Sequence, residues 1–116
     1  MVPRVGTART GVAEVPLDQV HPLHPVPRPG KPPHHIAQLA ALIQTNGYDL
    51  GQAIPVARMP DWRLLLLGGH HRVPAMRQLG ETTIPGRIVD WTSLSPGVQN
   101  WWKRQFPGFN WGDFRA

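Results

Sequence analysis

The fold of this chain is decided by the stretch Leu64-Leu65-Leu66-Leu67-Gly68-Gly69-His70-His71-Arg72. The four leucines indicate a buried strand, the two glycines a tight turn, and the residues from about His71 to Leu79 a helix. The first backbone amides of a helix have no partner inside it and carry partial positive charge, so they attract anions. The stretch therefore predicts a binding site for phosphate or another anion, closed by Arg72.

Length and composition bound what the rest of the chain can do. Its 116 residues suit a single domain. The net charge is +5, and ten of the twelve basic residues are arginines, which favours anionic partners; the alternative is a basic surface that binds nothing. The absence of cysteine excludes disulfides, thiolate metal sites and thiol catalysis. The longest apolar run is far shorter than the ~20 residues of a membrane span, so we expect a soluble protein without membrane contact.

The chain divides into three parts by composition. Residues 1–12 are short of large apolar side chains and predict a linker or disordered arm. Residues 13–94 predict the folded domain, interrupted by a proline-rich surface loop from His21 to Pro33. Residues 95–116 predict a C-terminal helix and an aromatic tail packed on the domain.

Local patterns predict the elements of the domain. Apolar spacing predicts a helix over 33–46, and strands are expected at 53–59, 62–67 and 82–91, the first two joined by a turn at Pro60-Asp61 into an antiparallel pair. Pro55 predicts that the first of these strands lies at an edge or begins late. Ser95-Pro96 predicts the start of a last helix. Its residues expected to cover the core are Val98, Trp101, Trp102 and Phe106.

These motifs together resemble the ParB/sulfiredoxin superfamily. The resemblance spans residues 14–91 and rests on a strand, Gly68-Gly69-His70-His71-Arg72, a helix ending at Gly80, and then Glu81-Thr82-Thr83-Ile84-Pro85. Glu14-Val15-Pro16-Leu17, Asn46-Gly47 and Ile54-Pro55-Val56 extend it. It implies an α+β fold, with a small mixed β-sheet flanked by helices.

The resemblance also implies roles for individual residues. In sulfiredoxins a catalytic cysteine precedes a histidine and an arginine that hold ATP phosphates, which implies phosphate binding by the glycine turn, His71 and Arg72. His70 stands at the cysteine position, so repair of sulfinic acids is chemically closed to this chain. The first helix of sulfiredoxins carries lysine and hydroxyl side chains. The positions that correspond to them in this chain are occupied by His35, Gln38 and Leu42. The partition-protein branch binds a cytidine nucleotide, and its additional arginine is best matched by Arg28.

One branch of the superfamily resembles the chain most. ParB-like nucleases also have adjacent histidines before an arginine in a short domain, whereas the 25 residues after Trp91 are too few for the DNA-reading domain of a partition protein. This resemblance implies cleavage of phosphoesters in DNA or RNA, as the toxin domain of a secreted bacterial effector neutralised by a cognate immunity protein. Such a domain acts in the cytoplasm, either of the cell that produces it or of a target cell. The alternative is a module that binds ATP or CTP, with or without hydrolysing it.

Phosphoester cleavage can also be argued from the residues themselves. It needs positive charge on the phosphoryl oxygens and a group that moves a proton near neutral pH. Arg72 and the helix amides supply the charge, and an imidazole with a pKa near about 6.5 suits the proton transfer. The turn points neighbouring histidines in different directions, so we expect His71 to face the phosphate and His70 to lie close behind. The alternative for His70 is a packed, hydrogen-bonded structural residue.

Further candidates flank this turn. His34 and His35 open the first helix and can join the site from its opposite wall. The resemblance favours His35, which lies at the family's phosphate-binding lysine position; for His34 the alternative is a solvated helix end. Imidazoles suit Zn or Mn, but no HExxH spacing or carboxylate cluster appears, so a divalent metal (Mg, Mn or Zn) stays an open question. The tryptophans with nearby basic residues predict either a surface that stacks single-stranded nucleic acid or ordinary core. Trp111 and Phe114 suggest a partner-binding patch.

Overall fold

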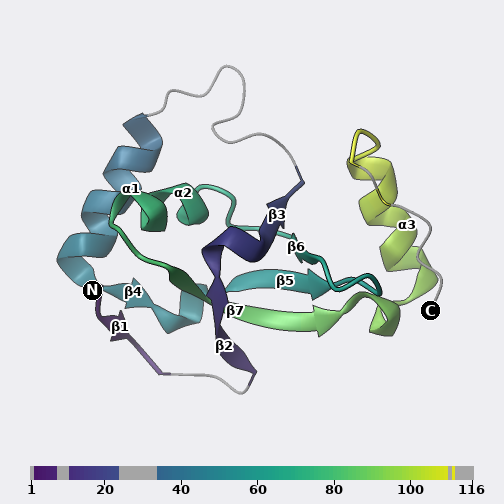
Figure 1. Cartoon of the computed structure of the whole chain (residues 1–116), viewed down its shortest axis with the longest axis horizontal. Coiled ribbons are helices and arrows are strands. Elements are labelled where there is room, and N and C mark those ends of the chain that lie inside the picture. Colours follow the sequence, from purple (N-terminus) through teal and green to yellow (C-terminus); the bar gives the residue numbers. More distant parts are fainter. Residues whose placement is uncertain (1, 8–10, 24–33, 110, 112–116) are drawn as a thin grey trace.

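The computed structural model describes residues 2–7, 11–23, 34–109 and 111, which form an α+β fold (Figure 1). The strands are β1 (Arg4–Val5), β2 (Val12–Pro16), β3 (Val20–Pro22), β4 (Tyr48–Asp49), β5 (Ile54–Arg58), β6 (Leu64–Leu66) and β7 (Thr83–Asp90). The α-helices are α1 (His34–Asn46), α2 (Arg72–Gln78) and α3 (Pro96–Gln105), and short 3₁₀ turns follow β2, β4 and β7 at Leu17–Gln19, Leu50–Gln52 and Trp91–Ser93. Within these described residues, no helix has the length and apolar character needed to cross a membrane.

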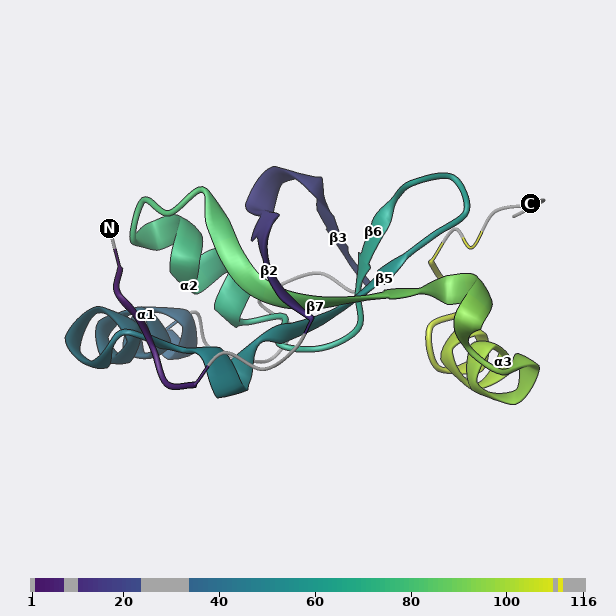
Figure 2. The ribbon, with the colours of Figure 1, turned by 90° about the horizontal axis from the view of Figure 1, so that it is seen from below.

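Five strands form one mixed sheet in the order β2-β7-β5-β6-β3. The β2–β7 and β5–β6 pairs are antiparallel, while β7–β5 and β6–β3 are parallel. The predicted mixed sheet with flanking helices is therefore confirmed. Figure 2 shows α1 and α3 at opposite ends of this sheet.

β5 is an inner strand, so the prediction of an edge strand from Pro55 was wrong. β5 pairs with β7 on one side and with β6 on the other. The carbonyl of Pro55 accepts a hydrogen bond from the N–H of Leu67 at 2.9 Å, so this residue faces β6 just where β6 ends. Its missing N–H therefore removes only the last hydrogen bond of that ladder, which is why proline is tolerated there.

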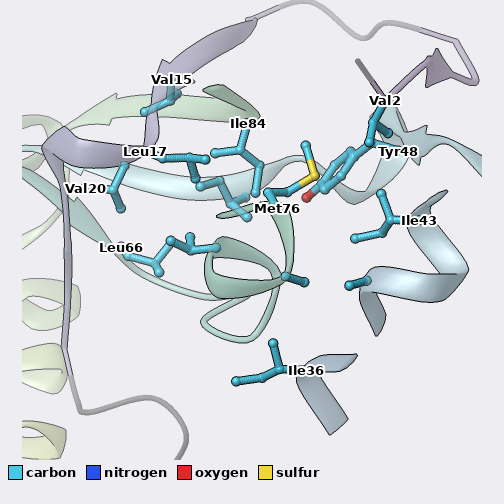
Figure 3. Packing of buried hydrophobic residues seen from close by; sticks show 14 of the residues in the cluster. Val2, Val15, Leu17, Val20, Ile36, Ile43, Tyr48, Leu66, Met76 and Ile84 are labelled. Atoms are coloured by element: carbon cyan, nitrogen blue, oxygen red, sulfur yellow. The ribbon is translucent and has the colours of Figure 1, made fainter. Parts of the chain in front are cut away.

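The centre of the sheet, at β5 and β6, is buried on both faces, which explains the uninterrupted run of leucines. Successive side chains of a strand point to opposite faces. Ile54, Val56 and Leu66 enter a first cluster that is shared with α1 and α2 (Figure 3). Ala57 and Leu65, from the same two strands, enter a second cluster on the side of α3. A strand that is covered on both faces has no polar side to alternate with.

α3 packs on the second cluster through Trp102 and Phe106. Val98 and Trp101, expected to cover the core beside them, are instead 43% and 47% exposed, so the prediction was wrong for these two residues. The side chains of consecutive residues in an α-helix point about 100° apart, so Trp101 does not lie on the helix face through which Trp102 packs on the cluster.

The aromatic tail completes the second cluster. Trp111 stacks on Trp91 with ring centroids 5.3 Å apart, and its Nε1 donates to the carbonyl of Phe106 at 2.9 Å. Trp111 therefore packs on the second cluster and is only partly buried. Its part in a partner-binding patch stays a prediction, and Phe114 lies outside the described residues.

Residues 2–7 do not form the linker that was predicted for residues 1–12. Val2 is buried in the first cluster, and β1 pairs in parallel with β4. Arg4 donates from Nε to Glu14 Oε1 at 2.8 Å, which joins this segment to β2. A two-residue strand is too short to show any periodicity, so sequence patterns could not reveal it.

The burial of Val2 makes a prediction about stability. Val2→Ala removes two methyl groups from a side chain that is only 7% exposed, and should lower the free energy of unfolding by about 1–2 kcal/mol. Val5→Ala is the matched control, because Val5 is 37% exposed and should change it by less than about 0.5 kcal/mol. Urea denaturation measures both, and equal small effects would mean that this segment does not contribute to the core.

Candidate functional site

A cleft of about 590 Å³ lies between α1, the turn from β6 to α2, and α3. Leu39 lines it from α1, and Trp101, Trp102, Gln105 and Phe106 line it from α3. The turn contributes every residue from Leu67 to Arg72. The cleft thus has one wall of glycines, histidines and an arginine, and an aromatic wall contributed by α3.

Two glycines allow the turn to lie directly on β5. Gly69 has a φ of +69°, and a Cβ there would lie 2.8 Å from Cγ2 of Ile54. A Cβ at Gly68 would lie 3.2 Å from Cγ of Pro55. The N–H of Arg72 donates to the carbonyl of Gly69 at 2.9 Å, and α2 begins there. The predicted order of strand, glycine turn and helix is therefore confirmed.

The two histidines of the turn take different positions. His70 is 9% exposed, and its Nε2 accepts a hydrogen bond from the N–H of Leu23 at 3.2 Å. That bond ties the turn to the end of β3 and favours the structural alternative for His70 over a catalytic role. His71 is half-buried in the wall of the cleft, immediately before Arg72.

Arg72 is held by a residue that sequence analysis missed. Its Nη1 donates to the carbonyl of Gln52 at 3.0 Å, and its Nη2 donates to Gln52 Oε1. The hydroxyl of Tyr48 donates to the same carbonyl at 2.9 Å. A guanidinium has five N–H donors, so these two bonds orient Arg72 and leave donors for an anion. No motif or spacing in the sequence marks Gln52.

The remaining predicted site residues fall in different places. His35 is exposed on α1 and does not line the cleft, which Leu39, one turn further along the helix, does. Gln38 instead lines a separate groove with Ala41, Leu42 and Thr45, so the structure does not bring it to the turn from β6 to α2. Arg28 and the side chain of His34 lie outside the described part of the chain.

The described residues contain no group of three or more His, Asp or Glu side chains that could together hold a metal ion. The described lining of the cleft includes two histidines and no carboxylate. Among the described lining residues, positive charge therefore comes from Arg72, and from a histidine when its imidazole is protonated.

The chain belongs to the ParB N-terminal domain family, whose model matches residues 3–96. The match ends where α3 begins. No curated protein sequence matches the chain. The family assignment confirms the resemblance to the ParB/sulfiredoxin superfamily.

Solved structures share this fold. Sulfiredoxin from Arabidopsis thaliana has a TM-score of 0.56 at 25% identity, over 68% of this chain and 84% of that one. The C-terminally truncated chromosome-partitioning protein ParB from Caulobacter crescentus, complexed with CTP-gamma-S, has a TM-score of 0.59 at 21% identity, over 89% of this chain. A mutant of a free serine kinase in complex with AMP has a TM-score of 0.53 at 20% identity, over 79% of this chain. The chain spans about half the length of that ParB structure (55%) and about a third of that kinase structure (35%).

Tyr48 gives the site a measurable pH dependence. Burial raises the pKa of Tyr48 to about 12, although the Arg72 guanidinium acts in the opposite direction. The unfolded chain loses this proton near pH 10, so the associated stability is complete below pH 10 and is lost as the pH rises to about 12.

Ultraviolet titration tests this prediction directly, because Tyr48 is the sole tyrosine of the chain. We expect its phenolate to appear near pH 12 in the folded protein and near pH 10 in urea. In the Tyr48→Phe variant, the free energy of unfolding should no longer show this decrease above pH 10, as denaturation curves at each pH would reveal. A folded-state titration at the ordinary pKa would contradict the burial of this hydroxyl.

Proposed function

We propose that this chain binds a nucleoside phosphate in the cleft, with the phosphate at the turn from Gly68 to Arg72. The observation that carries the proposal is the position of His71 and an oriented Arg72 beside two glycines in the wall of one cleft. The ParB and kinase structures that share the fold were solved with CTP-gamma-S and with AMP, which supports the same class of ligand here.

The physical basis of binding is the combination of an accessible backbone and a fixed charge. Glycines carry no Cβ, so a phosphate can approach the main chain of the turn closely. A guanidinium binds phosphate through two parallel hydrogen bonds, which fix its orientation as well as its position. His71, in the same wall of the cleft, adds positive charge when its imidazole is protonated.

Cleavage of phosphoesters in DNA or RNA is the second candidate. The observation that favours it is a half-buried histidine, His71, that lines the same cleft as Arg72, since proton transfer and charge stabilisation are the two requirements of this chemistry. Under this proposal the chain is a ParB-like nuclease, the toxin domain of a bacterial effector that a cognate immunity protein inhibits. A domain of that kind would act in the cytoplasm of a target cell.

Calorimetric titration tests the proposed nucleotide binding. We expect wild-type protein to bind CTP or ATP, and Arg72→Ala to weaken binding at least about tenfold, the effect of losing a charged hydrogen bond of ~1.5–3 kcal/mol. Arg72→Lys should recover only part of the affinity, because an ammonium group lacks the planar fork. Melting curves show whether each variant is folded. Wild-type protein that binds neither nucleotide, or Arg72→Ala that binds as tightly as wild type, would refute the proposal.

The nuclease candidate needs its own assay, in which plasmid DNA and RNA are incubated with protein, with and without Mg²⁺, Mn²⁺ or Zn²⁺. Cleavage that His71→Ala abolishes, while nucleotide binding persists, supports a hydrolase. Intact polymers under every condition, with nucleotide still bound, leave the binding module as the function.

Gln52 provides a test of how Arg72 is positioned. Gln52→Ala removes the Oε1 acceptor of Arg72, so the guanidinium gains freedom that must be lost again on binding. We expect CTP affinity to fall about three- to tenfold with the melting temperature little changed. Gln38→Ala is the matched control, since Gln38 is an exposed glutamine in a different groove. Equal affinities of the two variants would show that the side chain of Gln52 does not position Arg72.

A further inference from the structure

The aromatic wall of the cleft comes from a part of the chain that the family match does not cover. Residues 101–106 lie beyond position 96, where that match ends. Trp101 is 47% exposed and lines the cleft, although burying an indole on the adjacent core would stabilise the fold.

Trp101 is exposed, yet its orientation is fixed. It meets Trp102 edge to face, with ring centroids 4.9 Å apart and an angle of 88°. Trp102 in turn stacks over Phe106 at 6.0 Å, and both belong to the second hydrophobic cluster. A ring that packs against a partly buried neighbour loses less entropy when a ligand stacks on it than a ring without such a contact.

Gln105 lies beside Trp101 on the same face of α3. The two residues are four positions apart, which places them one above the other on a helix, and both line the cleft. A glutamine amide carries both hydrogen-bond donors and an acceptor. An aromatic surface next to an amide matches a ligand that has a flat ring with polar edges.

We infer that Trp101 is the platform on which the base of the bound nucleotide stacks, with Gln105 placed to hydrogen-bond the edge of that base. This inference rests on the proposed function, and it assigns the substrate class to compounds that carry an aromatic base as well as phosphate. The cleft has a volume of about 590 Å³, and pockets that bind small molecules or cofactors have volumes of about 300–1,000 Å³. A sugar phosphate or inorganic phosphate would leave the aromatic wall empty.

Three ligands and three variants test the inference. CTP, ribose 5-phosphate and inorganic tripolyphosphate are titrated into wild type, Trp101→Ala, Trp101→Phe and Trp62→Ala. Trp62 is the matched control, because it is 77% exposed on the β5–β6 hairpin and does not line the cleft. Melting curves show that each variant is folded.

We expect Trp101→Ala to weaken CTP binding about tenfold or more, the usual effect of losing one base–aromatic stack. Its tripolyphosphate and ribose 5-phosphate affinities should stay within about twofold of wild type, since stacking is absent from both. Trp101→Phe should retain most of the CTP affinity, and Trp62→Ala all of it. CTP should also quench tryptophan fluorescence in wild type, and less in Trp101→Phe.

Two results would overturn the inference while the proposed function stands. One is unchanged CTP affinity in Trp101→Ala; the other is an equal loss of CTP and tripolyphosphate affinity, which would make Trp101 a structural support of the cleft. If wild-type protein binds neither CTP nor tripolyphosphate, the proposed function fails and the inference fails with it.

Discussion

The close contact between Gly69 and Ile54 determines where the functional groups of this protein lie. Ile54 is fully buried in the first cluster, so it is a rigid support for the turn that follows β6. A Cβ at position 69 would lie 2.8 Å from Cγ2 of Ile54, and the positive φ adds strain for any residue other than glycine. Gln52 precedes Ile54 by two residues and binds the guanidinium of Arg72. One short segment therefore supports the backbone of the turn and orients its arginine.

The sequence could predict only those features of this arrangement that depend on residues close together in the chain. Leu64 to Arg72 carry the change from strand to turn to helix within nine positions, and the structure has each element there. Gln52 could not be found in this way, because its role depends on the fold placing it against Arg72, twenty positions away. β1 was missed for the same reason: its two residues become a strand only by pairing with β4.

The last helix shows why an apolar pattern can mislead. Val98, Trp101, Trp102 and Phe106 recur at spacings that suit one buried face, and large apolar residues in a small domain usually belong to the core. In the structure, Trp102 and Phe106 cover the second cluster, whereas Trp101 and Gln105 lie one residue earlier and form an adjacent stripe along the cleft. The sequence alone does not show which of the two stripes packs on the core, because that depends on how the helix is rotated about its axis on the sheet.

His70 shows how a reactive position can become structural within the same fold. In the resemblance to sulfiredoxins, this position corresponds to the catalytic cysteine; here an imidazole, 9% exposed, accepts a hydrogen bond from Leu23 and holds the turn against the end of β3. A histidine that accepts through Nε2 must release that bond to take up a proton there, which opposes a role in proton transfer. The chain has no cysteine, so thiolate chemistry is excluded, and under the proposed function the phosphate would meet the positive charge of Arg72 and the imidazole of His71. Such a set suits holding a phosphate first, and any catalysis would have to arise from His71 acting on a ligand that is already bound.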